Sequence, residues 1–577
     1  MVRSDAFRDG ECNGSRDGAI MHDSPPFPFL TSRHPERTAF IRLSNPPPMA
    51  MRSLIQIALI VLAVAIVSVS ALMAPLDGDE EEFFAVEGIF YAPTHDDQVM
   101  VVGFDRILEV LDIPAKVVYN DVIYTVTVID GYGLVSANLS GIYIPESVES
   151  IEGPKLLRDL RWIEVSPLNL VYASSNGILF TKDMTTLLCY PKSLAYTSYS
   201  FPDTVTTIGE SSFAGNPYLE EITMGQKIRL IESGAFQGCT SLKWINHTAF
   251  GNILPDELLI IESYAFQDCE SLDDIVLPES LLMVENEAFS GCGISSILIN
   301  DGVTWIGDGV FTKCRNLVTI STNNSKYEAE GGVLFEIDPD NNLKTLKTYP
   351  CAREDPIYEI PYGVTDIAQL AFDGARYLEE LVFPMSMTTV PSFSIQDAIS
   401  LKSVVLSNTI LSLETNCFYG CVNLTEIEWG GNVTVLQVYS LANTGFADMV
   451  VPNSVLYIQD EAFAENRNLQ TVYLPASVQY MGGRVFADDL NLDHIEFAGS
   501  APTMAKDSLV VNIRDTDEFV VHLWVQKGFE LPEGVSNEYN IIDIEVLGER
   551  PYPQENLIAA VLCIILLLAV VRAVKDV

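Results

Sequence analysis

Apolar side chains recur at a fixed spacing through most of this 577-residue chain. A large apolar residue that follows a small one returns every 22 or 23 residues over long stretches, and a leucine usually comes six residues later. Such a period is typical of repeat folds, in which each repeat is one structural unit. The large residues of these units are Phe213, Phe236, Phe266, Phe289, Phe311, Phe372, Ile395, Phe418, Leu441, Phe463 and Phe486.

Within each unit the leucine begins a short strand pattern, seen at Leu272, Ile275, Leu277 and Pro278. Two inward side chains two residues apart indicate a strand, and proline fits where a strand ends. We expect each unit to hold one short strand, a corner, an apolar turn such as 478–481, and a return stretch. No unit of about 23 residues buries its own apolar side, so the units must stack. The predicted fold is a mainly β repeat solenoid.

Two irregular segments share a second pattern. Gly-Ile-Leu-Phe at 177–180 is followed by Tyr-Pro at 190–191, and Gly-Val-Leu-Phe at 332–335 is followed by Tyr-Pro at 349–350. Both patterns predict hairpin inserts, and the second explains why 61 residues separate Phe311 from Phe372. A repeated irregularity is more specific than a count of leucines.

The repeat and its inserts resemble the BspA-like leucine-rich-repeat family over about residues 83–546. The resemblance implies a leucine-rich-repeat solenoid and an exported adhesion or interaction protein, without identifying a ligand. It also implies an N-terminal cap at about 83–124 and a C-terminal cap at about 502–546, because solenoids need their open ends covered.

An apolar segment at 54–73 precedes the repeats, with Arg52 before it and a run of acidic residues after it. Its length and flanking charges fit a signal anchor, and its small residues fit a cleaved signal peptide equally well. Residues 1–48 are either a disordered cytoplasmic tail or an over-extended gene start, since Met49 or Met51 is a natural first residue.

A second apolar segment, 557–571, ends in Arg572 and Lys575. If the segment spans a membrane, these cations place the C-terminal end of the chain in the cytoplasm and the repeats outside the cell. The alternative is a buried core helix. The expected organisation is 1–48 extension, 49–76 signal peptide or signal anchor, 77–130 N-terminal cap, 131–497 solenoid with inserts near 172–191 and 327–350, 498–548 C-terminal cap, 549–556 linker and 557–574 transmembrane anchor.

Charge narrows the set of partners. The chain has 33 Lys and Arg against 78 Asp and Glu, a net charge of -45. Nucleic-acid affinity depends on neutralising phosphates with basic side chains, so we expect no nucleic-acid partner. The remaining expected partners are the membrane and an extracellular protein or glycan.

Acidic residues are enriched at outward strand positions, and we expect them to form a stripe along one face. Charge there prevents sideways aggregation of sheets, and it also suits a cationic partner or bridging divalent ions. The residues of this candidate binding stripe are Glu220, Glu221, Asp273, Asp274, Glu379, Glu380, Glu426, Glu428, Asp493 and Glu496.

Five cysteines occupy one position of the repeat, three residues after the large apolar residue. Zinc needs ligands that converge, whereas a repeat position spreads them along an axis, so the spacing disfavours a metal site. Disulfides between coils are a second alternative, and free structural thiols are the favoured interpretation. These residues are Cys239, Cys269, Cys292, Cys314 and Cys421.

No motif for hydrolase, zinc-protease or nucleotide-binding chemistry is present, and we expect no catalytic residue, metal or cofactor. Asp338, Asp340 and Asn342 alternate like a calcium loop, but Leu343 replaces the required glycine, which favours a hairpin tip. Candidate glycosylation positions are Asn138, Asn246, Asn323, Asn423 and Asn432.

These patterns favour a membrane-anchored cell-surface protein that mediates adhesion or recognises a protein or glycan. One alternative is a structural envelope component that self-associates. A less favoured alternative is an enzyme acting on surface polysaccharide, which would need carboxylates that converge in a cleft.

The flanking charges predict the topology. Protease added to intact cells should digest 77–546 and leave a small C-terminal fragment in the membrane, because only the solenoid faces outward. An immunoblot against the C-terminal tail measures this fragment. A solenoid protected until the cells are lysed would show that the orientation is wrong.

Overall fold

The computed structural model describes most of the region between the two apolar segments, and all described residues belong to one compact unit. The N-terminal extension, both apolar segments, the linker at 549–556 and the sequon residue Asn138 lie outside the described residues. Within the described residues, no helix is long and apolar enough to cross a membrane. The description covers 83–546 apart from 106, 136–138, 250, 512–519, 533–534 and 536–540.

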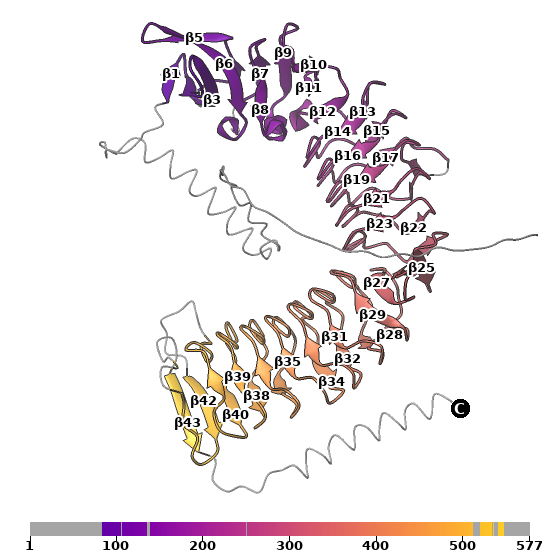
Figure 1. Cartoon of the computed structure of the whole chain (residues 1–577), viewed down its shortest axis with the longest axis vertical. Helices are drawn as coiled ribbons and strands as arrows, with labels where there is room; N and C mark the ends of the chain where they lie inside the picture. Colours follow the sequence, from indigo (N-terminus) through magenta and orange to yellow (C-terminus); the bar gives the residue numbers. More distant parts are fainter. Residues whose placement is uncertain are drawn as a thin grey trace, which may run out of the picture. The chain divides into compact units, whose positions relative to one another are not determined.

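The chain forms a β solenoid, as predicted, and its strands make two parallel rows (Figure 1). The first row, here called the long-strand ladder, follows the repeat leucines, and its strands pair in parallel from coil to coil with some interruptions. Its strands are β4 (Val110–Asp112), β7 (Gly141–Ile144), β9 (Trp162–Val165), β13 (Ser198–Ser200), β15 (Glu221–Thr223), β17 (Trp244–Ile245), β18 (Asn252–Ile253), β20 (Ile275–Val276), β22 (Ser296–Ile299), β24 (Thr319–Thr322), β28 (Ile357–Glu359), β30 (Glu380–Val382), β32 (Ser403–Val405), β34 (Glu426–Glu428), β36 (Asp448–Val450), β38 (Thr471–Leu474), β40 (His494–Phe497), β42 (Val520–Val525) and β43 (Ile541–Val546).

The second row, here called the short-strand ladder, corrects the expectation of one strand per unit. The stretch 478–481, interpreted as a turn, contains a strand, β39 (Tyr480–Met481), that pairs in parallel with its neighbours. Most strands of this row have two residues, which is too short for alternation to appear in the sequence. The others are β14 (Thr207–Ile208), β16 (Leu230–Ile231), β19 (Ile260–Ile261), β21 (Met283–Val284), β23 (Trp305–Ile306), β29 (Val364–Ile367), β31 (Thr389–Val390), β33 (Ser412–Leu413), β35 (Val435–Leu436), β37 (Tyr457–Ile458) and β41 (Thr503–Met504).

The N-terminal part begins with a mixed sheet of different topology. Its order is β1-β2-β3-β6-β5, and β8 pairs with β6 in parallel, as a strand of the next coil would. Short 3-10 helices follow at Tyr132–Leu134, Pro154–Asp159 and Lys192–Leu194. The strands are β1 (Phe84–Val86), β2 (Ile89–Pro93), β3 (Gln98–Phe104), β5 (Lys116–Tyr119), β6 (Val122–Asp130) and β8 (Ser150–Glu152).

Both irregular segments fold into antiparallel strands with the same defect. The register shifts between Leu179 and Phe180 in one copy and between Leu334 and Phe335 in the other. The third strand of each insert then pairs in parallel with the short-strand ladder, so the stack continues beyond it. The strands are β10 (Tyr172–Ser175), β11 (Ile178–Thr181), β12 (Thr186–Cys189), β25 (Tyr327–Glu330), β26 (Val333–Ile337) and β27 (Lys344–Thr348).

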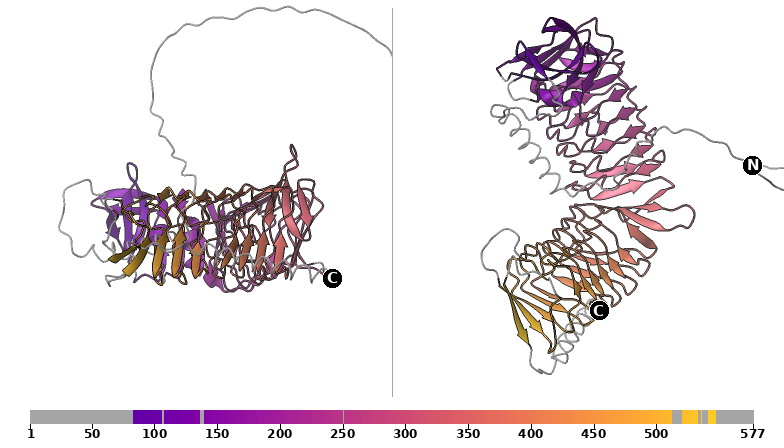
Figure 2. Two further views of the ribbon diagram at one scale, coloured as in Figure 1. Left: turned by 90° about the horizontal axis from the view of Figure 1, so that it is seen from below. Right: turned by 60° about the vertical axis from the view of Figure 1, so that its left-hand side comes forward.

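The repeat phenylalanines form the centre of the core. The rings of Phe266 and Phe289 stack with centroids 5.2 Å apart and planes 1° apart, and Phe289 and Phe311 follow at 6.0 Å. In Figure 2 the strands of successive coils run beside one another in the same direction, which keeps equivalent side chains in line. Ser290, next to Phe289, is also buried.

The return stretch of each coil depends on a left-handed backbone conformation two residues after the large apolar residue. Gly291 has φ +73°, and a Cβ there would lie 2.5 Å from Asp268 Oδ1 of the preceding coil. Asp268 itself has φ 58°, so the conformation belongs to the repeat position and glycine is its least strained occupant.

Replacing Phe289 by Ala should lower the free energy of unfolding by about 3 to 5 kcal/mol, because it removes a ring enclosed between two coils. Urea unfolding followed by circular dichroism measures the loss. The control is Leu298→Ala, whose side chain is 53% exposed on the same coil; it should change stability by less than about 0.5 kcal/mol. Equal losses at the two positions would contradict this description of the core.

Candidate functional site

The outward side of the long-strand ladder is the first candidate surface. In β15 the side chain of Ile222 is buried, while Glu221 and Thr223 are exposed. The same alternation recurs in β34 and β36. Each coil therefore presents outward side chains from a rigid sheet, and their identity is free of packing constraints.

The expected acidic stripe is not continuous, which corrects the sequence interpretation. Glu221 lies opposite Trp244 of the next coil. Glu380 and Glu426 are separated by Ser403, because all three belong to one column of successive strands. Glu428 lies in the other outward column, opposite Val405. The acids on these strands therefore occupy two outward columns, in which uncharged residues such as Trp244, Ser403 and Val405 lie beside them.

Four of the predicted acids directly follow the repeat leucine, and two of these are paired with lysines. Glu220 forms an ion pair with Lys243 at 3.3 Å, and Glu379 forms one with Lys402 at 2.7 Å. Each lysine comes from the next coil at the same repeat position. Such exposed pairs contribute little stability, but they interrupt the negative charge. The other two acids that follow the repeat leucine are Asp273 and Asp493.

Three of the predicted acids, Asp274, Asp493 and Glu496, interact with neighbouring polar residues. Asp274 Oδ1 accepts a hydrogen bond from Ser295 Oγ at 3.3 Å. Asp493 lies 3.4 Å from His494 Nδ1, which stacks on Trp524 with centroids 3.8 Å apart. Burial raises the pKa of the Glu496 carboxyl, and His494 opposes this effect. These acids therefore do not converge on one site.

Exposed apolar side chains lie between the acids on this face. They are large and separated by polar neighbours, so the face is mixed rather than purely acidic. Singly exposed apolar residues are normal, but several on one rigid surface suit contact with another macromolecule. They are Trp244, Val276, Leu298, Ile357 and Val450.

A second row of acidic residues lies beside the short-strand ladder, and the sequence analysis did not predict it. Glu232, Glu262 and Glu285 lie four residues before the repeat phenylalanine in successive coils. Glu232 Oε2 accepts the Glu210 N–H at 2.9 Å, and Glu262 Oε2 accepts the Ser233 N–H at 3.0 Å. Burial raises the pKa of Glu262, with further contributions from Glu232 and Glu285. In the sequence, this row is indicated by a glutamate that recurs three residues before an Ala-Phe pair.

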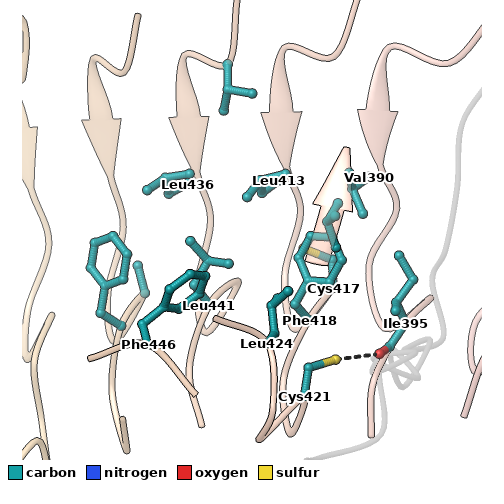
Figure 3. Close-up of a cluster of buried hydrophobic side chains, with 14 of the residues drawn as sticks. Val390, Ile395, Leu413, Cys417, Phe418, Cys421, Leu424, Leu436, Leu441 and Phe446 are labelled. Atoms are coloured by element: carbon teal, nitrogen blue, oxygen red, sulfur yellow. Dashed lines mark hydrogen bonds between the residues drawn. The ribbon is translucent and has the colours of Figure 1, made fainter. Parts of the chain in front are cut away.

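The cysteines occupy buried turns and bond to the neighbouring coil. Cys269 Sγ donates to the Phe236 carbonyl at 3.2 Å, and Cys421 Sγ donates to the Ile395 carbonyl at 3.1 Å (Figure 3). Burial raises the pKa of the Cys239 thiol to about 12. All eight cysteines in the described part of the chain are free. In that part, no three His, Cys, Asp or Glu side chains are grouped to hold a metal ion. Equivalent bonds are made by Cys239, Cys292 and Cys314.

Two later coils place polar residues at the cysteine position. Asn466 Nδ2 donates to the Leu441 carbonyl at 3.0 Å, the same kind of bond to the preceding coil. Asp489 is fully buried, and its Oδ1 accepts the Asn466 N–H at 2.6 Å. Burial raises the pKa of Asp489 well above its usual value. Ala375 and Ala398 take the same buried position in other coils, so the position selects a small side chain, and cysteine or asparagine there bonds to the neighbouring coil.

The loop that resembles a calcium site is the tip between β26 and β27. Asp338 Oδ1 accepts the Asp340 N–H at 2.9 Å, and the Asn342 N–H donates to the Asp338 carbonyl at 2.8 Å. Asn342 has φ 59°, a turn conformation that asparagine tolerates. These bonds close the hairpin.

The described sequons differ in accessibility. Asn246 is half-buried, and its amide bonds to the Ile253 carbonyl and the Met224 N–H. Asn323, Asn423 and Asn432 are exposed. Asn423 Nδ2 donates to the Ile399 carbonyl at 2.7 Å, which a glycan would displace.

Comparison with known proteins identifies the repeat. A family model described as the BspA type leucine rich repeat region matches six copies, which together cover more than half of the chain. The matched residues are 188–253, 246–336, 356–466 and 396–509. No curated protein matches the sequence.

Several solved structures are similar. A leucine-rich cell surface protein of Faecalibacterium prausnitzii A2-165 is 23% identical, with 73% of this chain and 96% of that chain covered and a TM-score of 0.41. The pneumococcal vaccine antigen PcpA is 16% identical, with coverage of 81% and 99% and a TM-score of 0.40. A leucine-rich repeat protein of Bacteroides ovatus ATCC 8483 is 19% identical, with coverage of 81% and 100% and a TM-score of 0.32.

Replacing Cys269 or Cys314 by Ala should lower the free energy of unfolding by about 1 kcal/mol each, the contribution of one neutral hydrogen bond. The double variant should lose about the sum, since the two residues lie in non-adjacent coils. Urea unfolding measures the losses, and the matched Cys→Ser variants, which keep a donor, should lose less. Stoichiometric zinc together with a melting temperature that falls on adding chelator would contradict the structural role.

Proposed function

The chain belongs to the BspA-type leucine-rich-repeat family, and from that premise we propose that it is a membrane-anchored cell-surface protein whose solenoid mediates adhesion or recognition. The observation that carries the proposal is the mixed outward face of the long-strand ladder. Its exposed side chains are held by a sheet whose opposite side is buried. Binding by such a face costs little ordering of the backbone.

The proposal assigns no chemical reaction to the chain. Hydrolysis of a glycosidic bond needs two carboxyl groups that face one substrate bond. The predicted acids lie instead in separate columns, and two of them are paired with lysines. This arrangement supports a binding surface over a polysaccharide-active enzyme.

Anchoring is proposed from the sequence. Segment 557–574 would hold the C-terminus in a membrane, and 49–76 would direct export as a signal peptide or signal anchor. The extracellular partner would be a protein or a glycan. The excess of 45 negative charges argues against nucleic acid as a partner.

A structural envelope component that associates with copies of itself is the alternative. Negative charge on both ladders opposes lateral association of identical faces. Recognition of a different partner is therefore the better supported function.

Cells that display the full chain should adhere to at least one surface in an array of matrix proteins, glycans and envelope proteins. Cells without the gene for the chain should lose that adhesion, because the solenoid supplies the contacts. Counting bound cells on each surface measures the difference.

A second experiment tests the alternative role as a structural envelope component. Sedimentation of the purified full chain should show a monomer over a wide concentration range, with saturable binding to the surface identified. Ordered assemblies that grow with concentration, without adhesion to any surface, would favour the envelope role.

A further inference from the structure

Two adjacent coils present exposed aromatic side chains opposite each other on the short-strand ladder. Earlier strands of this ladder begin with Leu230, Ile260 and Met283, each followed two residues later by glutamate. The strands β37 and β39 begin instead with Tyr457 and Tyr480, which lie opposite each other.

The residues that replace the glutamates are neutral. Gln437 and Gln459 take the place of Glu232, Glu262 and Glu285, and Gly482 takes it in the coil after them. A repeat protein provides its own comparison, because every coil solves the same packing problem. Glycine also takes this position as Gly307, two residues after Trp305, and at Gly307 and Gly482 alike a Cβ would lie 2.4 Å from a backbone nitrogen of the preceding coil. Packing therefore explains the glycine, whereas it makes no such demand on the two outward tyrosines.

A hollow lies beside these tyrosines. It has a volume of about 320 Å³ and is lined by Val435, Val438, Tyr457, Gln459, Asp460 and Tyr480. Gly482 and Gly483 contribute no side chains beside it, and a Cβ at Gly482 would lie 2.3 Å from Asp460 Oδ1. The Gly483 N–H donates to that same oxygen at 2.7 Å, which fixes the carboxylate at the edge of the hollow.

The polar groups around the hollow suit hydroxyl groups. Asp460 has a second carboxylate oxygen, and Gln459 carries an amide that both donates and accepts. The Tyr457 hydroxyl donates to Gln479 Oε1 at 3.4 Å, which orients its ring. Both tyrosine rings remain about two-fifths exposed, at 42% and 37%.

We propose that this hollow binds one pyranose ring of a neutral saccharide against the side chains of Tyr457 and Tyr480, with Gln459 and Asp460 bonded to its hydroxyls. The proposal deepens the recognition function above and rests on it. An aromatic ring offers a flat apolar face to the C–H side of a sugar, and fixed polar groups select its hydroxyl positions.

Charge distinguishes a sugar from the other candidates. A carboxylate beside the hollow, in a chain of net charge -45, disfavours an anionic ligand. A cationic side chain would suit Asp460, but the replacement of glutamate by glutamine at two successive coils removes the charges that would attract it. Neutral donors and acceptors remain.

The test measures binding of cellotriose, maltotriose, mannotriose and chitotriose to the full chain by saturation-transfer NMR and calorimetry. A detergent without a sugar headgroup keeps the apolar segments soluble without competing. At least one trisaccharide should bind, and Tyr457→Ala and Tyr480→Ala should each weaken it at least about tenfold, equal to about 1.4 kcal/mol. Both rings are partly exposed, so the melting temperature should stay close to that of the wild type.

The matched control is Trp305→Ala. Trp305 is an exposed aromatic residue at the equivalent strand position, but it lies opposite Met283 and not a second aromatic ring. This variant should bind like the wild type. Asp460→Asn, which keeps one acceptor for the Gly483 N–H, should weaken binding by less than the loss of either ring.

Three outcomes would overturn the proposal. They are no binding of any trisaccharide up to about 10 mM, binding that both tyrosine variants retain, and binding of pentalysine, lost in the tyrosine variants, in place of sugar. Adhesion of the intact chain to a protein surface in any of these cases would leave the recognition function standing.

Discussion

Every coil of this solenoid depends on its neighbours for both hydrogen bonding and burial. A two-residue strand such as β19 has no stability alone, and it persists because parallel strands flank it on both sides. The same stacking encloses the ring of Phe266 between those of Phe236 and Phe289, at 5.1 and 5.2 Å. The positions of the core side chains, the turns and the buried thiols all follow from the spacing of the stacked coils.

The inserts show how strictly this spacing is kept. Each one adds antiparallel strands, yet it returns a tyrosine to the position of the repeat phenylalanine. The ring of Tyr190 stacks on Phe213 at 4.7 Å, and that of Tyr349 stacks on Phe372 at 5.1 Å. An insertion is tolerated where it leaves the column of large buried side chains unbroken, because a missing side chain would leave a cavity between two coils.

The same constraint separates structural positions from functional ones. Inward positions accept only residues that fill a fixed volume, and the turn after the phenylalanine accepts cysteine, asparagine or aspartate that bonds to an adjacent coil. Outward positions need neither fill a fixed volume nor bond to an adjacent coil, so the residues found there reflect other requirements. The exposed tyrosines Tyr457 and Tyr480, opposite each other on adjacent strands, are informative for this reason.

The sequence by itself determined the solenoid, its period, its column of large buried side chains and the two inserts, because each depends on residues close together in one coil. The repeat position of Cys269 also followed from the regular spacing of residues in the sequence. Only the tertiary structure decided that its thiol bonds to Phe236 of the preceding coil. It also decided that Glu380 and Glu426 are separated by Ser403, and that two tyrosines flank a hollow. These contacts join different coils of unequal length, and two-residue strands carry no alternation from which their register could be read.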